Sequence, residues 1–194
     1  MKLPTREKLK LEALELFATK GFTNTTVGDI EQAAGLTPRA GGFYRHFPSK
    51  MSILESIVEE TETDIFDDFE SSLLLPLGDI KAELLTIGRM ILRVGAKYAS
   101  LRILLRAEGR NLPEFRKKML SINSRLPKEY LIPWVSKQLK SSAFSNKNLE
   151  EMVQIIFGSV FYYMAGLDLS AEPYGLEQDS FLQSWAEVWA INLS

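Results

Sequence analysis

The stretch from Thr25 to Lys50, TTVGDIEQAAGLTPRAGGFYRHFPSK, constrains the fold more than any other part of the chain. Thr26 stands three residues before Asp29, the spacing at which a threonine and an acidic side chain cap the free amides at the start of a helix. Gly35 stands where that helix would end, because glycine readily adopts the left-handed conformation that closes a helix. These signals predict one short helix after Thr26.

A second start signal follows closely. Thr37 can cap free amides, and Pro38 loses no hydrogen bond at a first helical position. We therefore expect a second short helix over residues 38–46, and the two together predict a helix-turn-helix. Gly41 and Gly42 leave an alternative open, in which they belong to a longer turn and the helix starts later, because each costs about 1 kcal/mol relative to alanine inside a helix.

The rest of the chain also has helical spacing. Apolar residues recur on one face through residues 5–20, 79–98, 147–167 and 176–192, and sustained strand-like alternation is absent from the sequence. We expect an all-α chain, with an N-terminal three-helix helix-turn-helix head joined to a C-terminal helical bundle. We assign residues 1–50 to the head and residues 51–194 to the bundle.

Composition removes most classes of enzyme. The sequence has no cysteine and one histidine, His46, so thiol nucleophiles, cysteine-bound metals and a histidine-dependent catalytic pair are not expected. We predict a non-enzyme without cofactor or metal. No apolar run approaches the roughly 18 residues of a membrane span, and no signal peptide is evident, so the expected location is the cytoplasm.

Charge is divided unequally along the chain. Residues 1–50 hold eight Lys or Arg and five Asp or Glu, a net charge of +3. The remainder holds fifteen basic and twenty acidic residues, a net charge of −5. A basic head on an acidic body is what local binding to phosphates requires.

The first 55 or so residues resemble the N-terminal head of TetR-family transcriptional regulators. The likeness combines nineteen positions, in order and nearly at the family's spacing, and the body adds a weaker likeness over residues 107–114. The positions that carry it are Arg6, Ala13, Leu16, Phe17, Gly21, Phe22, Thr25, Thr26, Val27, Ile30, Ala34, Gly35, Leu36, Phe43, Tyr44, His46, Phe47, Ser49 and Lys50.

The resemblance implies a homodimer whose body binds an unknown small-molecule effector and whose two heads bind a palindromic operator in double-stranded DNA. A repressor released by its effector is the expected function. One departure is that about two extra residues separate Leu36 from Phe43. The residues that face bases therefore cannot be assigned by counting along the family's pattern.

The expected DNA contacts lie in the head. Arg39 is the candidate base reader, because a guanidinium can bond O6 and N7 of guanine in the major groove. It leads the tip Arg39-Ala40-Gly41-Gly42. The candidate phosphate contacts, grouped by their hydroxyl, imidazole or cationic side chains, are Thr26, Thr37, Tyr44, Arg45, His46 and Lys50. For Arg45 a solvated charge, and for His46 a local hydrogen bond, remain alternatives.

Two weaker sets are expected in the body. Bulky side chains that would line an effector pocket, with ordinary core packing as the alternative, are Met90, Tyr98, Trp134, Phe157, Phe161 and Tyr162. Segments 147–167 and 176–192 are apolar over so wide a face that they predict a dimer surface, or else central core helices. Its candidate residues are Leu149, Met152, Ile156, Val160, Phe181, Trp185 and Trp189.

Two other functions compete with the regulator. One is a helical ligand-binding or protein-interaction module whose helix-turn-helix no longer reads DNA, because the expected reading segment is rich in glycine. The other is an enzyme that uses only carboxylates, which no nucleotide loop, nucleophile–base pair or metal-ligand spacing supports.

Overall fold

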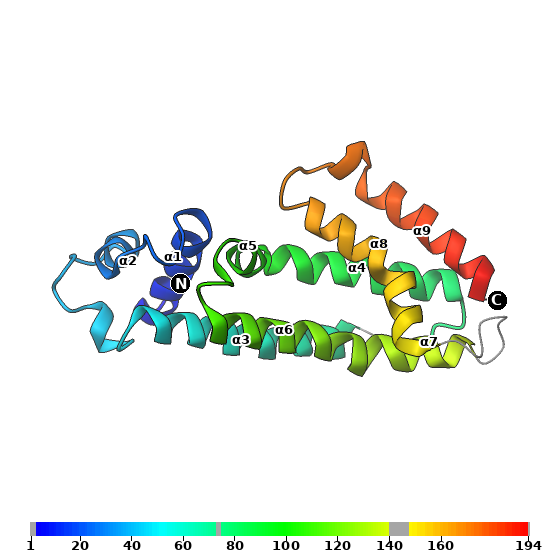
Figure 1. Cartoon of the computed structure of the whole chain (residues 1–194), viewed down its shortest axis with the longest axis horizontal. Coiled ribbons are helices and arrows are strands. Elements are labelled where there is room, and N and C mark those ends of the chain that lie inside the picture. Colours follow the sequence, from blue (N-terminus) through cyan, green and yellow to red (C-terminus); the bar gives the residue numbers. More distant parts are fainter. Residues whose placement is uncertain (1–2, 73–74, 140–147, 194) are drawn as a thin grey trace. The chain divides into compact units, whose positions relative to one another are not determined.

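The chain is helical throughout the residues that its computed structural model describes, which are 3–72, 75–139 and 148–193 (Figure 1). No strand occurs in these ranges. No helix within them is long and apolar enough to cross a membrane. The elements are α1 (Thr5–Thr19), α2 (Val27–Ala33), the 3-10 turn η1 (Phe43–Arg45), α3 (Lys50–Ser72), α4 (Ile80–Lys97), α5 (Ala99–Glu108), α6 (Pro113–Leu126), the π-helix η2 (Pro127–Leu131), α7 (Ile132–Leu139), α8 (Leu149–Gly166), the 3-10 turn η3 (Pro173–Gly175) and α9 (Gln178–Leu193).

The chain divides into two compact units that each take separate stretches of sequence. The first unit is Met1–Asp64 with Tyr98–Ser121, and the second is Ile65–Lys97 with Ile122–Ser194. This differs from the expected division at residue 50. Two features explain the difference: α3 continues without a break beyond the head, and α5 packs against α1 although the sequence separates them widely.

The first unit packs the head around the aromatic and aliphatic side chains of α1. Leu9, Ala13 and Phe17 lie on one face of α1 and are buried, as their spacing predicts. The predicted capping box is confirmed at α2, where the Thr26 hydroxyl accepts from the Asp29 amide at 3.1 Å and the Asp29 carboxylate accepts from the Thr26 amide at 2.8 Å. The carboxylate also pairs with Lys20, whose hydrogen bond is the main cause that lowers the pKa of Asp29 to about 2.

The predicted helix over residues 38–46 does not form. Only Phe43–Arg45 makes a single 3-10 turn, and residues 37–42 are irregular. Arg39 and Gly41 have positive φ angles of 64° and 76°, which no right-handed helix accommodates. The alternative of a longer turn with a late helical start is therefore the correct one.

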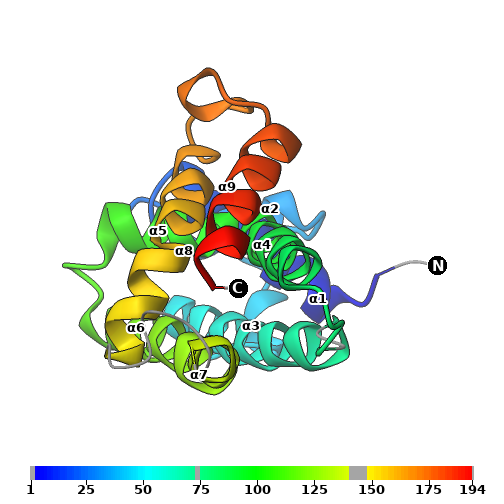
Figure 2. The ribbon, with the colours of Figure 1, turned by 90° about the vertical axis from the view of Figure 1, so that its right-hand side faces the viewer.

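The second unit is a bundle in which α4 lies beside both α8 and α9 (Figure 2). Gly88 permits the close approach of α9, because a Cβ atom at this position would stand 2.9 Å from Leu182 Cδ2 and 3.0 Å from Trp185 Cζ3. Trp134, Phe157 and Trp185 pack ring against ring inside the bundle. The π-helix η2 begins at Pro127 and separates α6 from α7.

Candidate functional site

The residues between α2 and η1 form a turn with a defined shape, which we call the reading turn (Thr37–Gly42). The Ala40 amide donates to the Thr37 carbonyl at 3.3 Å, and Leu36, just before the turn, donates to the main-chain carbonyl of Glu31 at 2.8 Å. Pro38, Arg39 and Ala40 are exposed. The turn thus presents its side chains outward although it is not helical.

A buried carboxylate holds the reading turn from inside. Glu31, on α2, is only 1% exposed. One of its carboxylate oxygens accepts from the Arg39 amide at 2.7 Å, and the other accepts from the Phe43 amide at 2.9 Å. Sequence reasoning missed this residue. The signal for it was a charged residue on the inward side of α2, one position after the buried Ile30.

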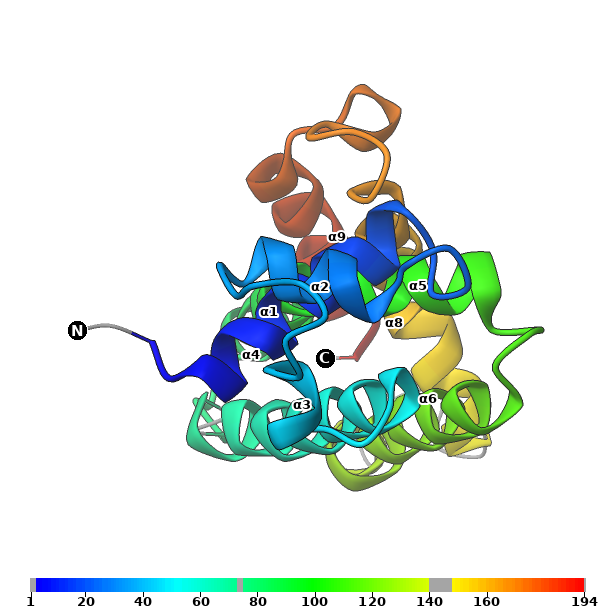
Figure 3. The ribbon, with the colours of Figure 1, turned by 90° about the vertical axis from the view of Figure 1, so that its left-hand side faces the viewer.

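Most of the predicted DNA contacts are exposed residues of the first unit, and they belong to the segment from the start of α2 to the start of α3, which can be followed in Figure 3. Tyr44 is 62% exposed although its neighbour Phe43 is fully buried. Edge-on packing of the two rings, 5.5 Å between centroids, fixes the direction of the Tyr44 side chain. The exposed members of the predicted set are Thr26, Thr37, Arg39, Ala40, Tyr44 and Arg45, and the half-buried members are Gly41, Gly42, His46 and Lys50.

Lys50 is engaged inside the unit. Its ammonium donates to the carbonyls of Phe22 and Thr25, both at 2.6 Å, and stands 4.6 Å from the centre of the Phe22 ring. Burial lowers the pKa of Lys50. The ammonium therefore closes the turn between α1 and α2. Its predicted phosphate contact remains a prediction, and this second role was not anticipated.

Two further side chains tie the head together. Arg6 donates to the carbonyl of His46 at 2.9 Å and lies over the Phe47 ring, 4.2 Å from its centre. Glu108, at the end of α5, accepts from the amide and the hydroxyl of Thr23 at 3.3 and 3.0 Å. Position and orientation of the segments around the reading turn thus depend on contacts from α1 and α5.

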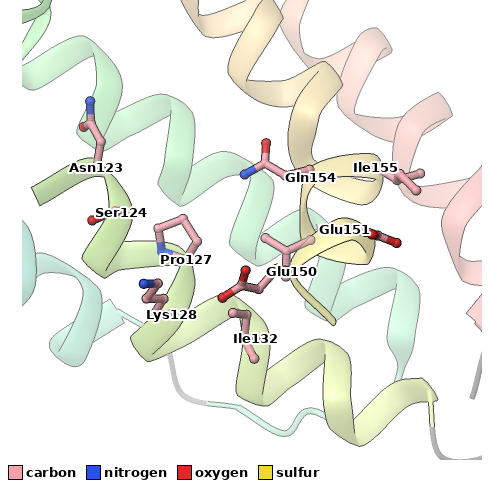
Figure 4. Close-up of a pocket in the computed structure, with 10 residues that line it drawn as sticks. Asn123, Ser124, Pro127, Lys128, Ile132, Glu150, Glu151, Gln154 and Ile155 are labelled. Atoms are coloured by element: carbon pink, nitrogen blue, oxygen red, sulfur yellow. The ribbon is translucent and has the colours of Figure 1, made fainter. Parts of the chain in front are cut away.

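The second unit has a pocket of about 580 Å³ between the α6–η2 junction and α8. Figure 4 shows Asn123, Ser124 and Lys128 on one wall and Glu150 and Gln154 on the other. A volume of this size is in the range that small-molecule sites occupy. The complete lining is Asn123, Ser124, Pro127, Lys128, Ile132, Glu150, Glu151, Val153, Gln154 and Ile155.

None of the predicted effector residues lines this pocket. Met90 and Phe157 are buried in the bundle, and Trp134 is buried too and lines a smaller pocket of about 240 Å³. Phe161 is half-buried, and Tyr162 is 64% exposed and stacked on Tyr174. Tyr98 belongs to the first unit. Core packing, the alternative explanation, therefore describes Met90 and Phe157.

The residues predicted to form a dimer surface differ in how far they are buried. Met152, Ile156, Val160 and Trp185 lie in the core of the protomer, because their side of α8 and α9 faces α4. Leu149, Phe181 and Trp189 are half-buried. The exposed apolar side chains on these helices are Ile155 and Tyr162 of α8 and Val188 and Ile191 of α9, with exposures of 56–74%.

Comparison with known proteins gives the same picture of the head. A family model described as "Bacterial regulatory proteins, tetR family" matches residues 11–57. The transcriptional regulator TcmR of Streptomyces glaucescens is 47% identical over 49 residues, which are 25% of this chain and 21% of TcmR. The transcriptional repressor KstR2 of Rhodococcus jostii is 40% identical over 57 residues, 29% of this chain and 27% of KstR2. The matched segment thus spans 21% and 27% of the length of these relatives.

Similarity in structure extends over the whole chain. A TetR-family regulator from Bordetella parapertussis superposes with a TM-score of 0.71 over 97% of this chain and 95% of its own, at 17% identity. The described residues define an all-helical protein, with an N-terminal head that matches the tetR-family model and a helical body. Residues 11–57 are similar to the head of TetR-family regulators, and the chain shares the fold of a TetR-family regulator. Among the described residues, no group of three or more His, Asp or Glu is arranged to hold a metal.

Proposed function

We propose that this protein is a ligand-responsive repressor that binds a palindromic DNA operator as a homodimer and leaves it when a small molecule binds the body. The observation that carries the proposal is the reading turn, which offers Arg39 to the outside on a backbone held by a buried carboxylate. Tyr44 and Arg45 are exposed directly beyond it, where a hydroxyl and a guanidinium are suited to phosphates. Because its target is DNA, we place the protein in the cytoplasm.

Homodimerisation is proposed to use the exposed apolar side chains of α8 and α9. Ile155 and Tyr162 are seven residues apart and so share one face of α8, and Val188 and Ile191 share one face of α9. Apolar side chains gathered on two neighbouring elements mark an interaction surface. A twofold dimer presents two reading turns, and a palindromic operator matches that symmetry.

The effector is proposed to bind between the α6–η2 junction and α8. The pocket walls combine apolar groups such as Ile132 and Val153 with polar ends at Asn123 and Gln154. Gln154→Trp is expected to fill this space and abolish effector response, whereas Leu120→Trp, at an exposed site on α6, is the matched control. Thermal-shift screening of a compound library identifies the effector. If Gln154→Trp still binds that compound, the effector site lies elsewhere.

The central experiment is selection of bound duplexes from a random pool. We expect two inverted half-sites about one helical turn apart or a multiple of it, and an affinity that falls steeply as salt rises, since phosphate contacts release counterions. The competing module that no longer reads DNA predicts no enriched sequence. Failure to enrich any duplex, with the protein folded and dimeric, would decide for that module.

A further inference from the structure

We propose that Glu31 is a positioning residue for DNA reading, and that the base reader of this protein is a preformed turn rather than a recognition helix. The inference rests on the proposed function and deepens it. Glu31 is buried beneath the turn and acts through the main-chain amides of Arg39, whose side chain is exposed, and Phe43. It is therefore expected to control which bases are read without touching them.

The first step of the argument concerns what replaces the helix. In a recognition helix, main-chain hydrogen bonds within the helix hold the shape of the reader. Here two amides of the segment instead converge on one side chain, with the two oxygens of Glu31 serving Arg39 and Phe43 separately. No Lys, Arg or His in the described part of the chain pairs with Glu31, so these amides are the groups that compensate its burial.

The second step concerns the backbone of the turn. Arg39 has a φ of 64°, which is a left-handed backbone conformation. For any residue other than glycine this conformation is unfavourable in free energy, and it persists only where the surroundings impose it. The amide that Glu31 binds at 2.7 Å is that of Arg39 itself. The carboxylate thus stabilises the one strained residue whose guanidinium is the candidate base reader.

The third step concerns Gly41. Its φ is 76°, and a Cβ atom added there would meet nothing within 4 Å. Only the backbone conformation, and not packing, therefore demands glycine at this position. Arg39 and Gly41, the two left-handed residues, thus lie in the segment whose Arg39 and Phe43 amides both donate to the Glu31 carboxylate.

The test compares Glu31→Gln with Glu55→Gln, a change of the same type at an exposed position on α3. Glutamine has one acceptor oxygen and one NH₂ group, so one of the two amides must lose its partner. In hydrogen exchange of the full chain, we expect faster exchange at Arg39 and Phe43. The Leu36 amide, bound to the main-chain carbonyl of Glu31, is expected to stay protected.

The DNA measurement uses the selected operator and a random duplex of equal length. Glu31→Gln is expected to lower the ratio of operator to random-duplex affinity about tenfold, within the range of one bidentate base contact. The slope of affinity against salt is expected to remain that of the wild type, because no phosphate contact is lost. An unchanged affinity ratio, or unchanged exchange at both amides, would overturn the proposal.

A second variant covers the case in which Glu31→Gln does not fold. Gly41→Ala penalises the left-handed backbone of the turn without touching the core, and Gly28→Ala, inside α2, is its control. We expect Gly41→Ala alone to lower the affinity ratio, and equal ratios for both alanine variants would overturn a preformed turn. If the wild type binds no DNA, the proposed function fails. The hydrogen-exchange rates of the Arg39 and Phe43 amides still decide whether Glu31 holds the turn.

Discussion

Glu108, at the end of α5, accepts two hydrogen bonds from Thr23, which lies in the turn between α1 and α2. One oxygen accepts from the Thr23 amide at 3.3 Å and the other from its hydroxyl at 3.0 Å. The two residues are 85 positions apart in the sequence. The contact explains why residues 98–121 form one compact unit with the head.

Removing this contact is expected to destabilise the first unit. Thr23→Val deletes the hydroxyl and Glu108→Gln removes the charge, and each is expected to reduce the free energy of unfolding by about 1 kcal/mol, the usual contribution of one hydrogen bond. Urea unfolding of both single variants and the double variant gives their coupling energy. Strictly additive effects would show that the pair contributes nothing.

Arg39 and Tyr44 are expected to affect DNA binding in different ways. Arg39→Ala is expected to relax preference at one base position, while Tyr44→Phe weakens binding to all duplexes alike by removing a phosphate contact. Affinities for every single-base variant of the selected operator separate the two effects. If Arg39→Ala keeps the wild-type ranking of those variants, Arg39 does not read bases.

Lys50 is expected to matter for stability as well as for DNA. Lys50→Ala leaves the carbonyls of Phe22 and Thr25 without their ammonium donor, so we expect a loss of about 1–2 kcal/mol in the free energy of unfolding. Lys8→Ala, a half-buried lysine on α1, is the control. Chemical denaturation measures both, and wild-type stability of Lys50→Ala would leave only the phosphate role.

The cap of α2 is expected to weaken in acid. The pKa of Asp29 is lowered from the ordinary 3.8 to about 2, first by the Lys20 hydrogen bond and then by the Thr26 amide. A carboxylate with a lowered pKa in the folded state stabilises that state above pH 4 and loses this contribution as the pH falls from about 4 to 2. Asp29→Asn should therefore show a smaller loss of stability than the wild type over this interval. Urea midpoints at pH 5 and pH 2.5 provide the measurement.

The dimer surface is expected to fail when charge is placed on it. Ile155→Glu with Ile191→Glu should give a folded monomer, because both side chains are largely exposed in the protomer. Sedimentation measures the mass, and circular dichroism measures the helical content. Leu120→Glu, at an exposed site on α6, is the control. Met152→Glu, by contrast, should unfold the protein, since Met152 is 3% exposed. A dimer that survives the double variant would exclude this surface.

Much of the fold follows from local signals in the sequence. The capping box at Thr26 and the apolar face of α1 each depend on residues within a few positions of one another, and each is observed. The glycines of the reading segment also indicated a turn as the alternative to a helix. Local backbone preference at these positions was enough to predict where helices begin and end.

Tertiary contacts decided the rest. The broad apolar stripe on α8 has no feature in the sequence that separates the side facing α4 from the side that remains exposed. Ile156, predicted as a dimer residue, is therefore buried, and Ile155, which was not predicted, is exposed. The shape of the reading turn likewise depends on Glu31, eight residues before Arg39. By itself the sequence determined a basic head and most of the helices, residues 38–46 excepted, because these depend on neighbouring residues. Only the tertiary structure decided which atoms hold the reading turn. A carboxylate can replace the hydrogen bonds of a helix only when packing has buried it beside the amides that donate to it.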